Sequence, residues 1–253
     1  MNNSMNNSML LRDWKLSLTV DDVLRGQGAD PIIIRARRPA LIDLAEWALL
    51  EGLPLLEPSV LAETRLIKEI QHDRILLEGG GFLSGSLVQQ HLASATQVCV
   101  MVCTIGSQLE AISSELMDTE PLNALALEGL GTAAVESLAN QSCSYFEDKA
   151  VMAGLHTSIP LSPGMIGWSV NPGQRQIFAI LDTQLIGVRL NTNDMMTPRL
   201  SLTQVLGYGS SFNLEGSTCD YCSLKDTCRY QDHYQPNHPI DPSDDRKVNT
   251  QGM

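Results

Sequence analysis

The sequence has few basic residues and no long hydrophobic run. It carries 17 lysines and arginines against 29 aspartates and glutamates, which gives a formal net charge of −12. Surfaces that bind nucleic acid need basic side chains to neutralise phosphates, so this balance argues against a nucleic-acid partner. A membrane span needs about 18 consecutive apolar residues and a signal peptide needs an apolar core, and the sequence shows neither. We therefore expect a cytoplasmic protein without a membrane partner.

Catalytic signatures with fixed spacing are also missing. The chain has no G-x-S-x-G, no H-E-x-x-H and no complete dinucleotide-binding fingerprint. Three consecutive glycines, Gly79 to Gly81, lack the Lys-Ser/Thr of a phosphate-binding P-loop, and this favours a simple turn. No motif of this kind identifies an enzyme class.

Hydrophobic residues make up 43% of the 253 residues, which is enough to form the core of a globular protein. Apolar periodicity predicts a mixture of helices and strands without a strict βαβ rhythm, which indicates an α+β fold. We expect helices over 39–52, 58–72, 86–95, 108–117, 122–150 and 174–185. We expect strands over 74–78, 97–103 and 186–190 and another that starts at 200. Cys99 and Cys103 share one side of the second strand and are predicted to be buried thiols.

One loop stands out in this pattern. The stretch LSPGMIGWSVNPGQRQIFAILD, 161–182, crowds proline, glycine and one tryptophan into a short segment before an amphipathic helix. Glycine lets a ligand approach the backbone closely, and proline fixes the backbone and removes a hydrogen-bond donor. Such a loop is rigid and exposes backbone groups, so it is a candidate binding site.

Two segments, SPGMIGW…QRQIFAILD and IGVRL…MMTPRLSLTQVLGYG, resemble the activation domain of cobalamin (vitamin B12)-dependent methionine synthase, in particular its stand-alone relatives. The upstream blocks LLEGGGFLSGSLVQQHLASATQVCVMVCTIGSQLE and ALALEGLGTAAVESLA run in the same order, so the resemblance covers roughly residues 15–230. It implies a curved single α+β domain around a twisted antiparallel sheet. It also implies a role in reductive reactivation, in which an electron and a methyl group from S-adenosylmethionine restore cobalt that has slipped to Co(II).

The resemblance also implies site residues. Met196 and Pro198 match the family's Met-x-Pro, and Ser201 and Thr203 match its Ser-x-Ser. The predicted cofactor-binding residues are Ser162, Pro163, Gly164, Met165, Gly167, Trp168, Met196, Pro198, Ser201 and Thr203. Trp168 would offer a flat apolar surface to a corrin or an adenosyl group, and the alternative is that Trp168 and Met196 fill the core below these loops.

Two departures from the family pattern bear on the cofactor. The family has an arginine four residues before the motif glycine and a tyrosine directly after it, and both are associated with S-adenosylmethionine. Here these positions are Pro160 and Met165, so the bidentate partner for a carboxylate is lost. We expect S-adenosylmethionine to bind weakly or not at all.

The resemblance implies partners as well, because the sequence contains no homocysteine, folate or cobalamin module. We expect the protein to act on a separate corrinoid protein or cobalamin-dependent methyltransferase, with a possible electron-donor protein. The predicted function is that of an accessory protein for reductive reactivation. The alternatives are a non-catalytic binding module and a structural subunit of a corrinoid methyltransferase complex.

A cysteine-rich segment, TCDYCSLKDTCRYQDHYQPNH, begins near the C-terminal end of this region. Cys219 and Cys222 have the two-residue gap of a chelating pair, and Cys228 follows in a segment too polar to form core. We predict a zinc site, with His233 as fourth ligand, or an iron–sulfur cluster that Cys143 or another cysteine completes; reduced, unliganded thiols are the alternative.

The expected organisation is a disordered extension over 1–14, an activation-like domain over 15–215, a metal- or cluster-binding segment over 216–235 and a disordered end over 236–253.

Overall fold

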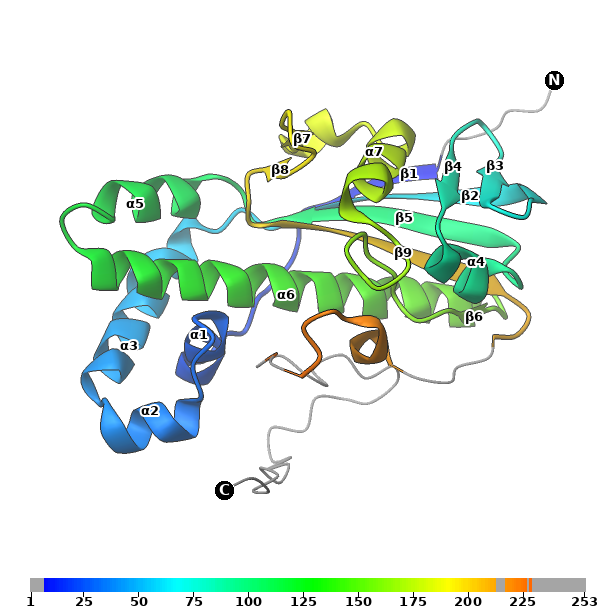
Figure 1. Ribbon diagram of the computed structural model, residues 1–253. Coiled ribbons are helices and arrows are strands. Elements are labelled where there is room, and N and C mark those ends of the chain that lie inside the picture. Colours follow the sequence, from blue (N-terminus) through cyan, green and yellow to red (C-terminus); the bar gives the residue numbers. More distant parts are fainter. Residues whose placement is uncertain (1–6, 213–216, 227, 229–253) are drawn as a thin grey trace.

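The structure is a computed structural model that describes residues 7–212, 217–226 and 228 (Figure 1). Its centre is an antiparallel sheet with the strand order β4-β3-β2-β5-β9-β6, and β1 also pairs with β2. A separate hairpin pairs β7 with β8. The strands are β1 (Asn7–Leu11), β2 (Ser59–Ile70), β3 (Arg74–Leu77), β4 (Phe82–Ser84), β5 (Gln97–Thr104), β6 (His156–Thr157), β7 (Arg189–Leu190), β8 (Met196–Thr197) and β9 (Ser201–Gly209).

Helices cover both faces of this sheet (Figure 1). The long helix α6 packs with α1, α3 and α5 on one face, whereas α4 and α7 pack on the other. The helices are α1 (Val20–Gly26), α2 (Pro31–Arg37), α3 (Ala40–Gly52), α4 (Ser86–Leu92), α5 (Gln108–Leu116), α6 (Pro121–Met152) and α7 (Val170–Ile180). No helix in the described part of the chain combines the length and the apolar character that a membrane span needs.

Alternate side chains of the central strands point to opposite faces of the sheet, so the hydrophobic core has two halves. In β5, Cys99 and Cys103 face the α6 side, while Val98, Val100 and Val102 face the α4 and α7 side. Successive side chains of a strand point to opposite faces, so a strand buried on both sides is apolar throughout. The prediction that Cys99 and Cys103 are buried thiols is therefore confirmed.

Glycines let α1 and α6 approach closely. A Cβ atom built on Gly26 would lie 2.0 Å from the carbonyl oxygen of Gly129, and one on Gly129 would lie 2.6 Å from the carbonyl oxygen of Val23. These distances are far below van der Waals contact, so the crossing requires hydrogen at both positions. Close packing thus accounts for the glycines in the middle of α6.

One predicted helix is wrong, because the 58–72 segment forms strand β2. This strand lies between β1 and β5, so its backbone hydrogen-bonds to neighbours on both sides. Its apolar residues alternate between the two half-cores, with Val60 and Ala62 toward α6 and Leu61 toward α7. Sheet pairing outweighs the helix propensity of its alanine, glutamate and lysine residues. The other expected helices and strands are present, but the helix expected over 174–185 runs over Val170–Ile180, and the strand expected over 186–190 is only β7.

The predicted N-terminal extension is also partly wrong. Strand β1 pairs with β2, and Trp14 packs edge-on against Tyr145 with the ring centroids 6.0 Å apart. Residues 7–14 therefore belong to the domain, because an apolar strand and an indole gain more from burial than the chain loses in entropy. Residues 1–6 and the predicted disordered end, 236–253, lie outside the described residues, and the other expected boundaries stay predictions. The expected fold class, a single α+β domain on a curved antiparallel sheet, is confirmed.

Candidate functional site

Helix α7 joins the two loops that the sequence singles out. The first loop, 161–169, leads directly into α7, and the second, 191–198, precedes strand β9. The Thr203 hydroxyl donates a hydrogen bond of 3.2 Å to Gln174 Oε1, which ties α7 to β9. Arg175 Nε donates to Asp194 Oδ1 at 2.8 Å, which ties α7 to the second loop. The fold therefore places both predicted segments on the α7 face of the sheet.

The first loop is closed by its own backbone hydrogen bonds. Gly164 N donates to the Trp168 carbonyl at 2.7 Å, and Trp168 N donates to the Met165 carbonyl at 2.9 Å. Gly164 and Gly167 have φ of +105° and +94°, a region that side chains with Cβ rarely adopt. A Cβ on Gly167 would also meet Ser86 Oγ at 2.6 Å, so this loop accepts only glycine there.

Five of the ten predicted cofactor-binding residues are buried, namely Met165, Trp168, Pro198, Ser201 and Thr203. Trp168 is 1% exposed and Met165 is 8% exposed, and both belong to the half-core below α7. Ser201 and Thr203 are buried in β9, where the Ser201 hydroxyl donates to the Pro198 carbonyl at 2.9 Å. For Trp168 the structure thus supports the core-filling interpretation.

The remaining predicted residues lie nearer the surface. Gly164 and Gly167 are exposed, and Ser162, Pro163 and Met196 are half-buried. Two large apolar side chains of the same loops are well exposed, namely Ile166 at 60% and Met195 at 55%. Sequence reasoning missed both, because neither matches a motif position. Their exposure at the tips of both loops is the signal that identifies them.

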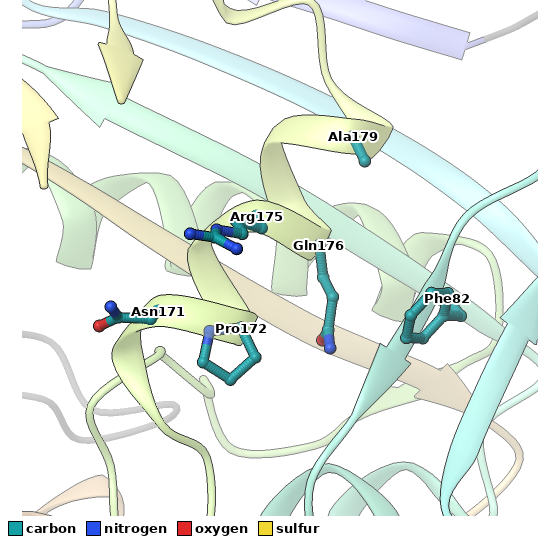
Figure 2. Close-up of a pocket in the computed structure, with 6 residues that line it drawn as sticks. All are labelled: Phe82, Asn171, Pro172, Arg175, Gln176 and Ala179. Atoms are coloured by element: carbon teal, nitrogen blue, oxygen red, sulfur yellow. The ribbon is translucent and has the colours of Figure 1, made fainter. Parts of the chain in front are cut away.

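An open groove runs beside α7 (Figure 2). It has a volume of about 510 Å³ and is lined by Phe82, Asn171, Pro172, Arg175, Gln176 and Ala179. Gln176 is held by two hydrogen bonds to Ser84, so it forms a fixed wall toward β4. The hydrogen bond to Asp194 raises the pKa of Arg175, so the guanidinium stays charged. The groove offers one cation, amide groups and an aromatic ring to a small polar ligand.

Pro160 and Met165 occupy the positions where the family has arginine and tyrosine. Both side chains are buried, and Met165 Sδ accepts a hydrogen bond from Ser162 N at 3.1 Å. The first loop thus presents no guanidinium or phenol at these two positions.

The described start of the cysteine-rich segment, residues 217–226, docks beside the first loop and on α4. Ile166 N donates to the Tyr221 carbonyl at 2.8 Å, and Gln90 Nε2 donates to the Tyr221 hydroxyl at 3.3 Å. The Tyr221 ring stands edge-on to the His91 ring, with the centroids 4.7 Å apart. Burial lowers the pKa of His91, so the imidazole is neutral at physiological pH.

The predicted metal ligands that the structure describes are not assembled into a site. Cys219, Cys222 and Cys228 are half-buried, and His233 lies outside the described residues. Within residues 7–212, 217–226 and 228, no three side chains of the ligating types lie close enough to hold an ion. Cys143 faces α6 and β9, where its thiol donates to Gln204 Oε1 at 3.1 Å and burial raises its pKa well above the ordinary value. It lies across the sheet from the docked segment, so the expectation that it completes a cluster is not supported.

Comparison with solved structures identifies the class of fold. The chain has the fold of an enzyme reactivation domain. Thirteen chains of solved structures match it, among them the crystal structure of the MetH reactivation domain bound to AdoHcy, with a TM-score of 0.57 and 10% sequence identity. The match covers 92% of this chain and 91% of the other, and it confirms the fold that the sequence resemblance implies. No protein-family model matches the sequence, and no curated protein shows significant similarity to it.

Proposed function

We propose that this protein assists the reductive reactivation of a cobalamin-dependent methyltransferase or corrinoid protein of the methionine synthase type. The observation that supports this proposal is the fold shared with the MetH reactivation domain over 92% of the chain. The same two loops that carry the sequence resemblance are joined by α7 on one face of the sheet. Function built on a common fold resides in such surface loops.

The face proposed to dock the partner consists of the exposed tips of both loops. It includes the Gly164 and Gly167 backbone and the side chains of Ile166 and Met195. Exposed apolar side chains at the centre of a docking face contribute most of the binding energy. Cobalamin would arrive on the partner protein, and the rigid glycine loop would let a broad corrin edge approach the backbone.

The cysteine-rich segment is proposed to bind a metal ion or an iron–sulfur cluster. A cluster would supply a redox centre next to the docking face, because Tyr221 of this segment bonds to Ile166 of the first loop. Zinc would instead fasten the segment to the domain. Electrons would reach a cluster from a separate donor protein.

A second candidate is a non-catalytic binding module or a structural subunit of a methyltransferase complex. Pro160 and Met165 favour it, because two buried apolar side chains stand where the family carries its S-adenosylmethionine contacts. A module that binds a corrinoid protein without methyl transfer needs the docking face but not these contacts. A reactivation assay with an added reductant and S-adenosylmethionine separates the two candidates: only an accessory reactivator accelerates the return of a Co(II) corrinoid partner to methylcobalamin.

The docking face is tested by Ile166→Glu in a pull-down with a cobalamin-loaded corrinoid protein. Ile166 is 60% exposed and bonds through its backbone, so the change places a charge on the face without disturbing the fold. We expect capture to fall at least about tenfold, as for loss of a central apolar contact. The matched control is Leu50→Glu on α3, which is 73% exposed on the opposite side of the sheet. Equal capture by both variants would reject this face.

Charged residues at Gly164 or Gly167 would be a poor test of the same face. Both glycines have positive φ, and Gly167 packs against Ser86. Replacement would distort the loop whether or not a partner binds there.

A further inference from the structure

The cysteine-rich segment is held on α4 by one aromatic anchor. Tyr221 contacts His91 through its ring, Gln90 through its hydroxyl and Ile166 through its carbonyl. Cys222 follows Tyr221 directly and Cys219 precedes it by two residues, so both lie within two steps of about 3.8 Å along the chain from this anchor. The two thiols of the chelating pair are therefore confined to the neighbourhood of α4.

The imidazole of His91 is buried with an unsatisfied nitrogen. The residue is 8% exposed, and its Nε2 atom has no hydrogen-bond partner in the described part of the chain. Five buried side-chain atoms there share this property, and three of them lie on α4 or in the segment docked on it: Gln89 Nε2, His91 Nε2 and Thr218 Oγ1. A buried polar atom without a partner costs free energy, so the unsatisfied Nε2 of His91, a residue in contact with the docked segment, points to a missing ligand.

We infer that His91 supplies the ligand from the folded domain to a metal centre whose other ligands are Cys219, Cys222 and Cys228. The inference rests on the metal-binding role proposed above for the cysteine-rich segment. Three thiolates and one imidazole form a closed tetrahedral set that suits zinc and also accepts iron or cobalt. Because no three ligands are preassembled among the described residues, the ion draws the thiolates in toward His91 as it binds.

The position of the other candidate ligand in the body supports this assignment. Cys143 is fully buried in the half-core around α6, bonds to Gln204 and lies across the sheet from α4. His91 is on the same face as the docked segment and in contact with it. A ligand shared between α4 and this segment fixes the metal beside the first loop, where the corrinoid partner is proposed to dock.

Cobalt(II) titration of the full chain under anaerobic conditions tests the assignment. Cobalt in a tetrahedral thiolate site gives intense visible bands, and the thiolate-to-cobalt charge-transfer absorption grows with the number of Co–S bonds. The wild-type protein is expected to bind one ion with the absorption of three such bonds. His91→Ala is expected to bind cobalt at least about tenfold more weakly. Removing a hydrogen-bond partner of a metal ligand already weakens metal binding by about this factor, and removing the ligand itself costs no less. His91→Cys is expected to restore tight binding with the absorption of four bonds.

The matched control is His156→Ala, which removes an exposed histidine from β6 and is expected to bind cobalt like the wild type. Unchanged affinity and spectrum in His91→Ala would overturn the role of His91 while leaving a metal site in the segment. If the alanine variant folds poorly, the His91→Cys spectrum still decides the question. Absorption by His91→Cys that is unchanged from the wild type would also overturn the role of His91. Failure of the wild-type protein to bind cobalt would overturn the metal-binding role of the whole segment.

Discussion

Gly173 is the contact point between the first turn of α7 and the loop that precedes it. A Cβ atom at this position would lie 2.8 Å from two ring carbons of Pro163 and 2.9 Å from Trp168 Nε1. Ordinary contact begins at 3.4 Å, so Gly173→Ala requires the loop to move by about 0.6 Å. Alanine adds about 1 kcal/mol of helix propensity, and overpacking of this size costs about 1–3 kcal/mol. We expect a net loss of up to about 2 kcal/mol of stability and weaker capture of the corrinoid partner.

Gly129→Ala is the matched control, since it makes the same change inside α6. Its Cβ would meet the Val23 carbonyl at 2.6 Å, and a backbone atom cannot rotate away as a side chain can. We expect α1 to shift and stability to fall by up to about 2 kcal/mol after the same gain in helix propensity. The α1–α6 crossing lies across the sheet from α7, so partner binding is expected to stay at the wild-type level.

Urea unfolding followed by tryptophan fluorescence measures both losses, with an unchanged m-value as the check that unfolding stays comparable. A loss of 1 kcal/mol corresponds to about 2–4 °C in Tm for a chain of this length. A Gly173→Ala variant that gains about 1 kcal/mol, the propensity increment alone, and binds its partner normally would refute the reasoning. It would show that the loop is not held against α7 by this contact.

Two further predictions concern the cofactor and the buried thiols. Because Pro160 and Met165 are buried and apolar, titration calorimetry is expected to detect no tight binding of S-adenosylmethionine, and a dissociation constant in the low micromolar range would contradict this. Burial raises the pKa of Cys99 to about 11 and that of Cys103 to about 12, from 9.0 for an ordinary thiol. As pH rises, the thiols of the unfolded chain lose their protons at a lower pH than those of the folded protein. The free energy of unfolding therefore has its full value below pH 9 and is expected to fall as pH rises from there through 11 and 12. The fall is up to about 1.4 kcal/mol per thiol and pH unit. Unfolding titrations of the wild type and of a Cys99→Ala/Cys103→Ala variant test this, and an equal pH dependence in both would contradict it.

Long periodic elements of this fold are readable from the sequence, and short or paired ones are not. Helix α6 repeats its apolar residues over many turns, and β5 is an unbroken apolar run, so both were predictable. Strand β2 has the composition of a helix, because its conformation is imposed by β1 and β5 on either side. Strand β1 in turn pairs with β2, which is distant from it in the sequence. Local sequence contains no information about that neighbour.

The candidate site shows the same limit at the level of single residues. The loops could be located because glycine and proline mark their backbone conformations. The exposure of Ile166 and Met195 could not be predicted, since it depends on which side of each loop faces the sheet. The contact between Tyr221 and His91 joins segments that are distant in the sequence, and no spacing rule connects them.

The burial of the motif residues explains what the sequence resemblance reports about this protein. The motif residues Trp168, Ser201 and Thr203 are buried and bonded within the half-core beneath α7, so similarity at these positions preserves the packing of the loops. A fold can therefore be retained at 10% identity while the exposed side chains change freely. The proposed docking of a partner would instead depend on the exposed positions and on residues 217–226, where Tyr221 bonds to the first loop. Ile166 is both a tip of the proposed docking face and a backbone donor to this segment, so the two elements are coupled through one residue.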